Sequence, residues 1–243
     1  MLKDKNHNVK KTVGIIGGMG PAATALLFQK MIDYTDAKTD ADHMHILIDN
    51  RPSIPDRTTA ILNGDDTPVK KICESGKQLE KMGAELIAIP CNTSHYFYPY
   101  IQEQLDVPVI NMLEETAKEC KKMGLDSVGV LATTGTKNTG IYEKALKAYD
   151  IETIYPDEEE QAVLMSLIYD YVKAGKAATS EMFKVELEEM KKEGAQAFIL
   201  GCTELPMVFH DGDLGFKFID SLDVLAKRAV EQAGYSLREL DRR

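Results

Sequence analysis

Two short stretches decide the fold: Leu86–His95, which reads LIAIPCNTSH, and Phe198–Pro206, which reads FILGCTELP. In each stretch a run of apolar residues leads to a cysteine, Cys91 in the first and Cys202 in the second, and small polar residues follow. A short apolar run bounded by turn-forming residues is typical of a buried strand in a parallel sheet. We therefore expect both cysteines just beyond the carboxyl ends of buried strands.

The sequence around these stretches contains an internal repeat. Cys91 lies 74 residues after Gly17, where the first predicted strand ends in GGMGP, and Cys202 lies 70 residues after Ala132, where a later strand ends in ATTGT. A further strand, VPVIN or FKFID, follows each cysteine and ends 20 or 18 residues beyond it. Strands alternating with helical patterns predict parallel α/β sheets.

The repeat predicts an α/β fold of two pseudo-symmetric lobes, each a parallel sheet flanked by helices. Residues 12–107 are expected to form the first lobe, completed by residues 216–243, and residues 108–215 to form the second. Ligands of open α/β sheets bind beyond the carboxyl ends of the strands. If the lobes face each other, both cysteines reach the cleft between them from opposite sides.

A pair of thiols on opposite sides of a cleft suits acid/base chemistry on both faces of one carbon atom. The ordinary thiol pKa is near 8.5, and a helix N-terminus or a nearby cation lowers it toward neutral pH. One thiolate could then take a proton from one face while the other thiol returns a proton to the opposite face. Cys73 and Cys120 lie inside helical patterns and are expected to serve packing.

Composition excludes several classes of partner. The 243 residues carry a formal net charge of -10 and no basic stripe, which disfavours nucleic acid and anionic membranes. No apolar run reaches the roughly 18–20 residues of a membrane span. Residues 1–11 are polar, without a signal-peptide core, and the four cysteines form no CxxC pair. These features predict a cytoplasmic protein with free thiols.

Polar residues beside the two cysteines are candidate substrate ligands. Asn92 and Thr93 follow Cys91, and Thr203 follows Cys202. Their side chains and backbone N–H groups could hold a carboxylate or the enolate-like oxygen of a carbanion. Capping of a following helix is the alternative role.

The mouths of the two lobes supply further candidates. Met19 lies in the glycine-rich turn after the first strand, and Thr133, Thr134 and Thr136 lie at the equivalent place in the second half. Of the three threonines, Thr134 is the one we expect to contact substrate. Simple turn chemistry is the alternative for all four residues.

Charged residues lie near these turns. Arg57, in IPDRT, carries a guanidinium that can bind a carboxylate in a bidentate manner, and Asp56 could orient it. Glu204 stands two residues after Cys202 and could tune that thiol. Asp56 and Glu204 could each instead cap a helix. Lys173 ends a predicted helix, where a lysine also complements the helix dipole. Arg51 is a further candidate cation.

Several motifs together resemble a known family. They are VGIIGGMGP, IPDRT, PCNTSH, ATTGT, VKAG and GCTELP, in this order between about Thr12 and about Ala233. The chain resembles the aspartate/glutamate racemase superfamily, and most closely its aspartate racemase branch. The resemblance implies a two-lobed pseudo-symmetric fold, catalytic cysteines at 91 and 202, no pyridoxal phosphate or other cofactor, and a homodimer.

The resemblance also bears on the substrate. It implies that Arg57 and Lys173 contact the two carboxylates of a small acidic amino acid. Glutamate racemases typically begin with D-S-G and carry C-T-H at the second cysteine, whereas this chain has Gly18-Met19-Gly20 and Thr203-Glu204. This departure favours aspartate, with glutamate or broad-range racemisation as the alternative.

Other activities stay open at this point. Maleate-type cis–trans isomerisation also uses two cysteines, and the two cations disfavour hydantoins. A non-catalytic binding protein for acidic amino acids would need no cysteine pair. Residues 18–23 fit G-x-G-x-x-A after a strand, a weak dinucleotide signal that points to a nicotinamide-dependent oxidoreductase as a distant alternative. His43 and His45 lack an evident third ligand, so we expect no metal site.

Overall fold

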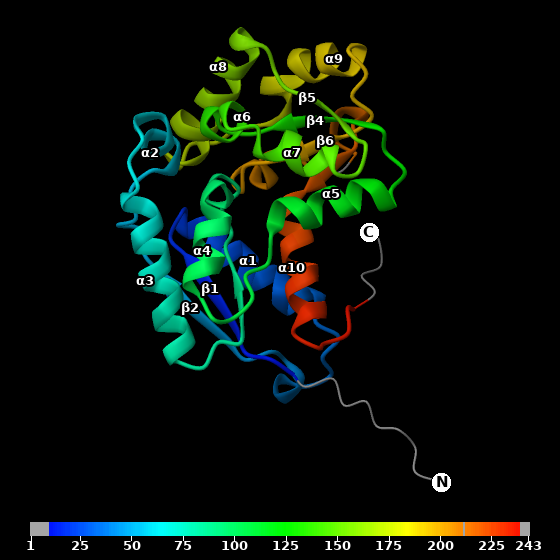
Figure 1. The fold of residues 1–243 in the computed structure, drawn as a ribbon. Helices are drawn as coiled ribbons and strands as arrows, with labels where there is room; N and C mark the ends of the chain where they lie inside the picture. The colour runs from blue at the N-terminus through cyan, green and yellow to red at the C-terminus, as the bar shows by residue number, and fades with distance from the viewer. Residues whose placement is uncertain (1–9, 211, 239–243) are drawn as a thin grey trace.

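The structure, a computed structural model that describes residues 10–210 and 212–238, contains two parallel sheets (Figure 1). The first has the strand order β2-β1-β3, and the second has the order β5-β4-β6-β7. The strands are short and mostly buried, as the apolar runs predicted. Their bounds are β1 Val13–Gly17, β2 Ile46–Asn50, β3 Leu86–Ala88, β4 Ser127–Leu131, β5 Glu152–Ile154, β6 Phe198–Leu200 and β7 Phe218–Asp220.

A fourth position in the first sheet makes the two sheets equivalent. Val109 forms a parallel bridge with Ile87 of β3. The backbone N–H of Ile87 donates to the carbonyl of Pro108 at 2.9 Å, and the N–H of Ile110 donates to the carbonyl of Ile87 at 2.9 Å. The pairing stays short because Pro108 has no N–H to donate. In order of appearance along the chain, both sheets therefore run 2-1-3-4, which confirms the predicted twin lobes.

Strand pairing moves both proposed lobe boundaries. Val109 pairs within the first sheet, although the first lobe was expected to end at residue 107. Conversely, β7 pairs with β6 of the second sheet, although residues 216–243 were expected to complete the first lobe. The chain thus crosses between lobes after residue 110 and again after β7. We propose these points as the lobe boundaries.

Helices cover both faces of the first sheet. On one face, Leu27 of α1 and Leu225 of α10 pack with Ile15 of β1. On the other face, Ile72 of α3 and Ile101 of α4 belong to the apolar cluster that surrounds Ile87. The bounds are α1 Pro21–Tyr34, α3 Thr67–Lys81, α4 Tyr98–Gln104 and α10 Ser221–Gln232.

The second sheet is covered in the same way. One apolar cluster joins α5 and α7 to Val128 and Val130 of β4. The other joins α8, the turn η3 and α9 to Phe198 and Leu200 of β6. No helix among the described residues is long and apolar enough to cross a membrane. The bounds are α5 Met112–Lys122, α7 Ile141–Lys147, α8 Glu158–Ser166, η3 Leu167–Val172 and α9 Lys184–Lys192.

The predicted helix that ends at Lys173 changes from one helix type to another partway along its length. It is α-helical in α8 and π-helical in η3. The sequence did not predict this change, because an apolar pattern does not distinguish backbone hydrogen bonds four residues apart from bonds five residues apart. Two short helices near the site were not predicted, since one or two turns show too little periodicity. These are α2 Arg57–Asn63 and α6 Thr134–Asn138, and the remaining short turns are η1 Asp40–Asp42, η2 Thr93–Phe97, η4 Ser180–Phe183, η5 Leu205–Met207 and η6 Asp213–Gly215.

The turn after β1 depends on Gly18. Its φ is +91°, and a Cβ atom there would lie 2.3 Å from the backbone carbonyl carbon of Arg51. Gly83 has a similar φ of +99°, but no atom lies within 4 Å of a Cβ placed there. The two glycines therefore share a backbone conformation and differ in the space around it.

We expect Gly18→Ala to lower the free energy of unfolding more than Gly83→Ala. The shared conformation costs an L-residue roughly 1–2 kcal/mol, and Gly18→Ala adds a clash with backbone that cannot rotate away. The midpoints of urea unfolding of the two variants and the unchanged chain measure this difference. Equal midpoints for both variants would show that the turn yields to the added methyl group.

Candidate active site

A small cavity lies where the two lobes meet. Its volume is about 10 Å³, room for about one water molecule, so a larger ligand enters only if the walls part. Both cysteines line it, although they come from strand ends of different sheets. The lining residues are Met19, Asp56, Arg57, Thr58, Cys91, Thr93, Thr133, Tyr169, Lys173, Cys202, Thr203 and Glu204.

Arg57 is the cation that accompanies Cys91. It begins α2, and Asp56 caps that helix by accepting a hydrogen bond from the N–H of Thr59 at 2.8 Å. The guanidinium donates from Nη2 to the carbonyl of Met19 at 2.9 Å and from Nη1 to the carbonyl of Pro55 at 3.0 Å. Its Nε is buried and has no hydrogen-bond partner among the described residues.

The surroundings of Arg57 keep its guanidinium protonated. Burial alone would lower the pKa of Arg57, but the charge of Cys91 and a hydrogen bond to it raise that pKa above its usual value. The guanidinium therefore stays positive although only 7% of its residue surface is exposed. A permanent positive charge therefore lies beside Cys91.

Cys202 has the opposite kind of neighbour. Its thiol donates a hydrogen bond to Oε2 of Glu204 at 3.0 Å. Burial raises the pKa of Cys202 well above its usual value, Glu204 raises it further, and Lys173 only partly opposes them. Cys202 is therefore held as a protonated thiol. The two cysteines are equivalent in topology and different in charge environment.

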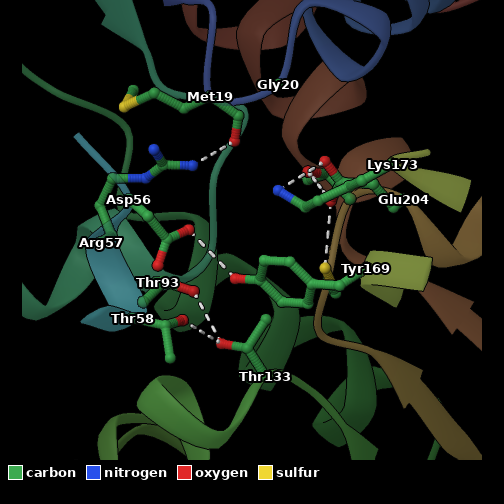
Figure 2. A network of polar contacts seen from close by, with 12 residues as sticks. Met19, Gly20, Asp56, Arg57, Thr58, Thr93, Thr133, Tyr169, Lys173 and Glu204 are labelled. Carbon is green, nitrogen blue, oxygen red and sulfur yellow. Dashed lines mark hydrogen bonds and ion pairs between the residues drawn. The ribbon is translucent and has the colours of Figure 1, made fainter. Parts of the chain in front are cut away.

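Lys173 completes this half of the site. Its Nζ lies 3.4 Å from Oε1 of Glu204. Burial lowers the pKa of Lys173, but the charges of Glu204 and then Cys202 raise it above its usual value, so the ammonium persists. Figure 2 shows Arg57 and Lys173 extending from opposite sides toward the space between them. Two cations thus face one cavity.

Tyr169 is a lining residue that the sequence analysis missed. It lies on η3, and its hydroxyl donates to Oδ2 of Asp56 in the other lobe at 3.1 Å. Its ring centroid is 5.1 Å from Nζ of Lys173. Burial, with the charge of Asp56, raises the pKa of Tyr169 to about 12, so the hydroxyl keeps its proton. The four-residue spacing from Lys173 on a helix was the available signal.

Hydrogen bonds between threonine hydroxyls also join the two lobes, near Tyr169 (Figure 2). The Thr58 hydroxyl donates to Oγ1 of Thr133 at 3.1 Å, and Oγ1 of Thr93 lies 3.1 Å from that of Thr133 and 2.9 Å from that of Thr136. Thr203 donates across the lobes to the carbonyl of Pro90 at 3.3 Å. The predicted residues Thr93 and Thr203 therefore lie at the site.

Two predicted substrate ligands lie outside the lining. The Asn92 amide is hydrogen-bonded to Tyr142 and Ser221, and Asn92 is not among the residues that line the cavity. The Thr134 side chain also lies outside the lining, because Thr133 takes the place at the cavity that we expected Thr134 to hold. Arg51 pairs with Asp49 at 2.6 Å, away from the cavity.

The described residues contain no group of three or more His, Cys, Asp or Glu side chains placed to hold a metal ion. His95, which follows the CNTS turn, is buried behind Cys91. The backbone N–H of Met112 donates to its Nε2 at 3.2 Å, and its Nδ1 lies 2.9 Å from the carbonyl of Cys91. Burial lowers the pKa of His95, so it is a neutral structural histidine.

Known proteins match this chain over most of its length. A family model described as Asp/Glu/Hydantoin racemase matches residues 16–229. RacX of Bacillus subtilis (strain 168), a broad specificity amino-acid racemase, is 34% identical over 222 residues, which cover 90% of this chain and 96% of RacX.

Solved structures of racemases also match this chain over most of its length. The aspartate racemase of Picrophilus torridus is 34% identical, with a TM-score of 0.81 over 94% of this chain and 96% of that one. The glutamate racemase of Francisella tularensis subsp. tularensis SCHU S4, solved with D-glutamate, shares the fold at 18% identity, with a TM-score of 0.66 over 92% of this chain and 81% of that one.

We expect iodoacetamide to alkylate Cys91 before Cys202, because the thiolate is the reacting form and Glu204 disfavours it at Cys202. Access does not separate the two, since their exposed fractions are 5% and 6%. Glu204→Gln, which keeps the size of the side chain and removes its charge, should speed the alkylation of Cys202. Peptide mass spectrometry over time measures each rate, with Cys120 as the buried reference. An unchanged Cys202 rate in Glu204→Gln would contradict this electrostatic account.

Proposed function

Because this chain belongs to the Asp/Glu/hydantoin racemase family, whose racemases are isomerases, we propose that it interconverts the enantiomers of an acidic amino acid, most readily aspartate. One observation carries the proposal. Two thiols with opposite charge environments, from different lobes, line one cavity together with two cations. This arrangement supplies a base, an acid and carboxylate ligands around a single carbon atom.

The proton transfer uses both cysteines. The Cys91 thiolate, beside Arg57, removes the α-proton and becomes a thiol. Cys202 then gives its proton to the opposite face of the carbanion and becomes a thiolate. The product is the other enantiomer, and exchange with water restores the starting protonation. In the reverse direction the two cysteines exchange roles. Whenever the Cys202 thiol is restored, it again donates a hydrogen bond to Glu204.

The cations account for an acidic substrate. The buried, unpaired Nε of Arg57 can donate to one carboxylate, and Lys173 can bind the other. Removing an α-proton places negative charge on the carboxylate oxygens, and hydroxyls such as those of Thr93 and Thr203 can stabilise that charge. Asp56 supports Arg57 indirectly, because it caps the helix on which Arg57 lies.

The choice of amino acid rests on separate observations. The C-T-E sequence at Cys202 and the name of the Picrophilus torridus relative favour aspartate. The name of RacX favours broad specificity, which is the second candidate. The homodimer and the cytoplasmic location expected from the sequence stay predictions.

We expect the protein to racemise L-aspartate without added cofactor and to place solvent deuterium at the α-carbon of the product in deuterated water. Cys91→Ala and Cys202→Ala should each lower kcat by a factor on the order of 10²–10⁴, since each removes one acid/base. Chiral chromatography with mass spectrometry measures conversion and isotope together.

Cys73→Ala is the matched control, because Cys73 is a buried cysteine on α3 away from the cavity. It should retain the activity of the unchanged protein. Full turnover in either Cys91→Ala or Cys202→Ala would end the two-base proposal. Protium retained at the α-carbon of converted product would end it as well.

Lys173→Met should weaken the binding of diacids by roughly 10- to 100-fold, the effect of losing one charge-assisted hydrogen bond. The inhibition constant of succinate, a diacid without an amino group, measures this binding without requiring proton transfer. Lys176→Met is the control, because Lys176 lies near the ring of Tyr171 and outside the cavity lining. Equal inhibition constants in both variants would remove Lys173 from the proposed carboxylate site.

A further inference from the structure

A buried hydrogen-bond network lies behind the two cysteines. The Asn92 amide donates from Nδ2 to the hydroxyl of Ser221 at 3.1 Å, and that hydroxyl donates to the carbonyl of Leu200 at 2.6 Å. On the other side of the amide, the Tyr142 hydroxyl donates to Oδ1 of Asn92 at 2.6 Å. The network therefore uses both polar atoms of the Asn92 side chain.

Two residues of this network, Asn92 and Leu200, are close in sequence to the two cysteines. Asn92 directly follows Cys91 beyond β3, and Leu200 ends β6 two residues before Cys202. Ser221, the first residue of α10, lies between them. The Ser221 hydroxyl thus connects the segment that follows β3 and carries Cys91 to the end of β6 in the other lobe, which leads to Cys202.

The network is dry. The exposed fractions are 0% for Tyr142, 2% for Asn92 and 0% for Ser221. Burial raises the pKa of Tyr142, so its hydroxyl stays protonated and remains a donor. Because water cannot replace a lost partner here, each broken bond leaves a buried polar group unsatisfied. The relative position of the two strand ends is therefore tightly specified.

We propose that Asn92, Ser221 and Tyr142 are positioning residues that fix the separation between the sulfurs of Cys91 and Cys202. The inference rests on the proposed two-base racemisation, in which both sulfurs must reach one carbon atom from opposite faces. A displacement of about 1 Å can lower the rate of such a step by about 10²-fold. It also gives Asn92 a role, although its side chain does not line the cavity.

The positioning role has a specific chemical consequence. When the separation is wrong, Cys91 still removes the α-proton, but Cys202 no longer reaches the opposite face. The Cys91 thiol exchanges its proton for solvent deuterium and returns the deuterium to the face it came from. The substrate is recovered as the same enantiomer carrying deuterium. Exchange therefore continues while inversion falls.

The test uses Tyr142→Phe and Ser221→Ala in the full-length protein, with L-aspartate in deuterated water. Early in the reaction, the deuterium in recovered L-aspartate is compared with the amount of D-aspartate formed. We expect the ratio of inversion to same-face exchange to fall on the order of 10- to 100-fold in both variants. The KM for L-aspartate should stay near that of the unchanged protein, because neither side chain lines the cavity.

Tyr155→Phe is the matched control. Tyr155 packs against the same apolar cluster as Tyr142, and its hydroxyl is buried without a hydrogen-bond partner among the described residues. The control should keep the ratio of the unchanged protein. A variant that merely loosens the fold lowers exchange and inversion together, so the ratio separates positioning from stability.

The outcomes are distinguishable. If the unchanged protein neither exchanges nor inverts L-aspartate or another amino acid, the proposed function fails. If it racemises and both variants keep its ratio, the positioning role is overturned while the function stands. Circular dichroism and gel filtration monitor folding, and if one variant does not fold, the other decides alone. If neither folds, the network serves the fold only and the inference falls.

Discussion

The structure depends on a geometric constraint: two thiols carried by different lobes have to lie against the same small cavity. Two sheets with the same strand order meet this constraint, because they place the carboxyl ends of their equivalent strands β3 and β6 toward each other. Each strand is only three residues long and is buried on both faces. The apolar clusters on either side hold the strands, and the polar residues beyond their ends are free to serve chemistry.

The two lobes have the same strand order, but the charges around their cysteines differ. Arg57 lies against Cys91, whereas Glu204 accepts a hydrogen bond from the Cys202 thiol and pairs with Lys173. The two-base mechanism that we propose needs one thiolate and one thiol, and burial and Glu204 keep the proton on Cys202. Because Arg57, Glu204 and both cysteines are buried, solvent screens these neighbouring charges less than it screens charges on the surface. In the proposed mechanism these unlike environments allow the two equivalent strand ends to serve as acid and base.

The chain segments that pass between lobes hold the two halves together. Helix α10 follows β7 of the second sheet and then packs against α1 beside the first sheet. Its first residue, Ser221, bonds to groups on both sides. Tyr169 and Asp56 connect the lobes at the edge of the cavity, where both residues are partly exposed. In our proposal the deep contacts position the two cysteines, whereas the outer contact joins the lobes at the edge of the cavity.

The amino-acid sequence by itself determined the twin α/β lobes and the two cysteines. These depend on local apolar periodicity and on the spacing of a repeat, both of which a single chain displays. It also identified Arg57, Lys173, Thr93 and Thr203 as residues that the structure brings to one cavity. Position after a strand was sufficient for Thr93 and Thr203, whereas the choice of Arg57 and Lys173 also depended on the family resemblance.

Only the tertiary structure decided which polar side chains face the cavity and which lie behind it. Asn92 was expected to contact substrate, but its amide is bonded to Tyr142 and Ser221, 50 and 129 residues away in the sequence. Tyr169 reaches the cavity because a π-helical turn and the docking of the lobes bring it beside Asp56, 113 residues away. Contacts between residues this far apart depend on how the lobes pack, and no local sequence pattern encodes that packing.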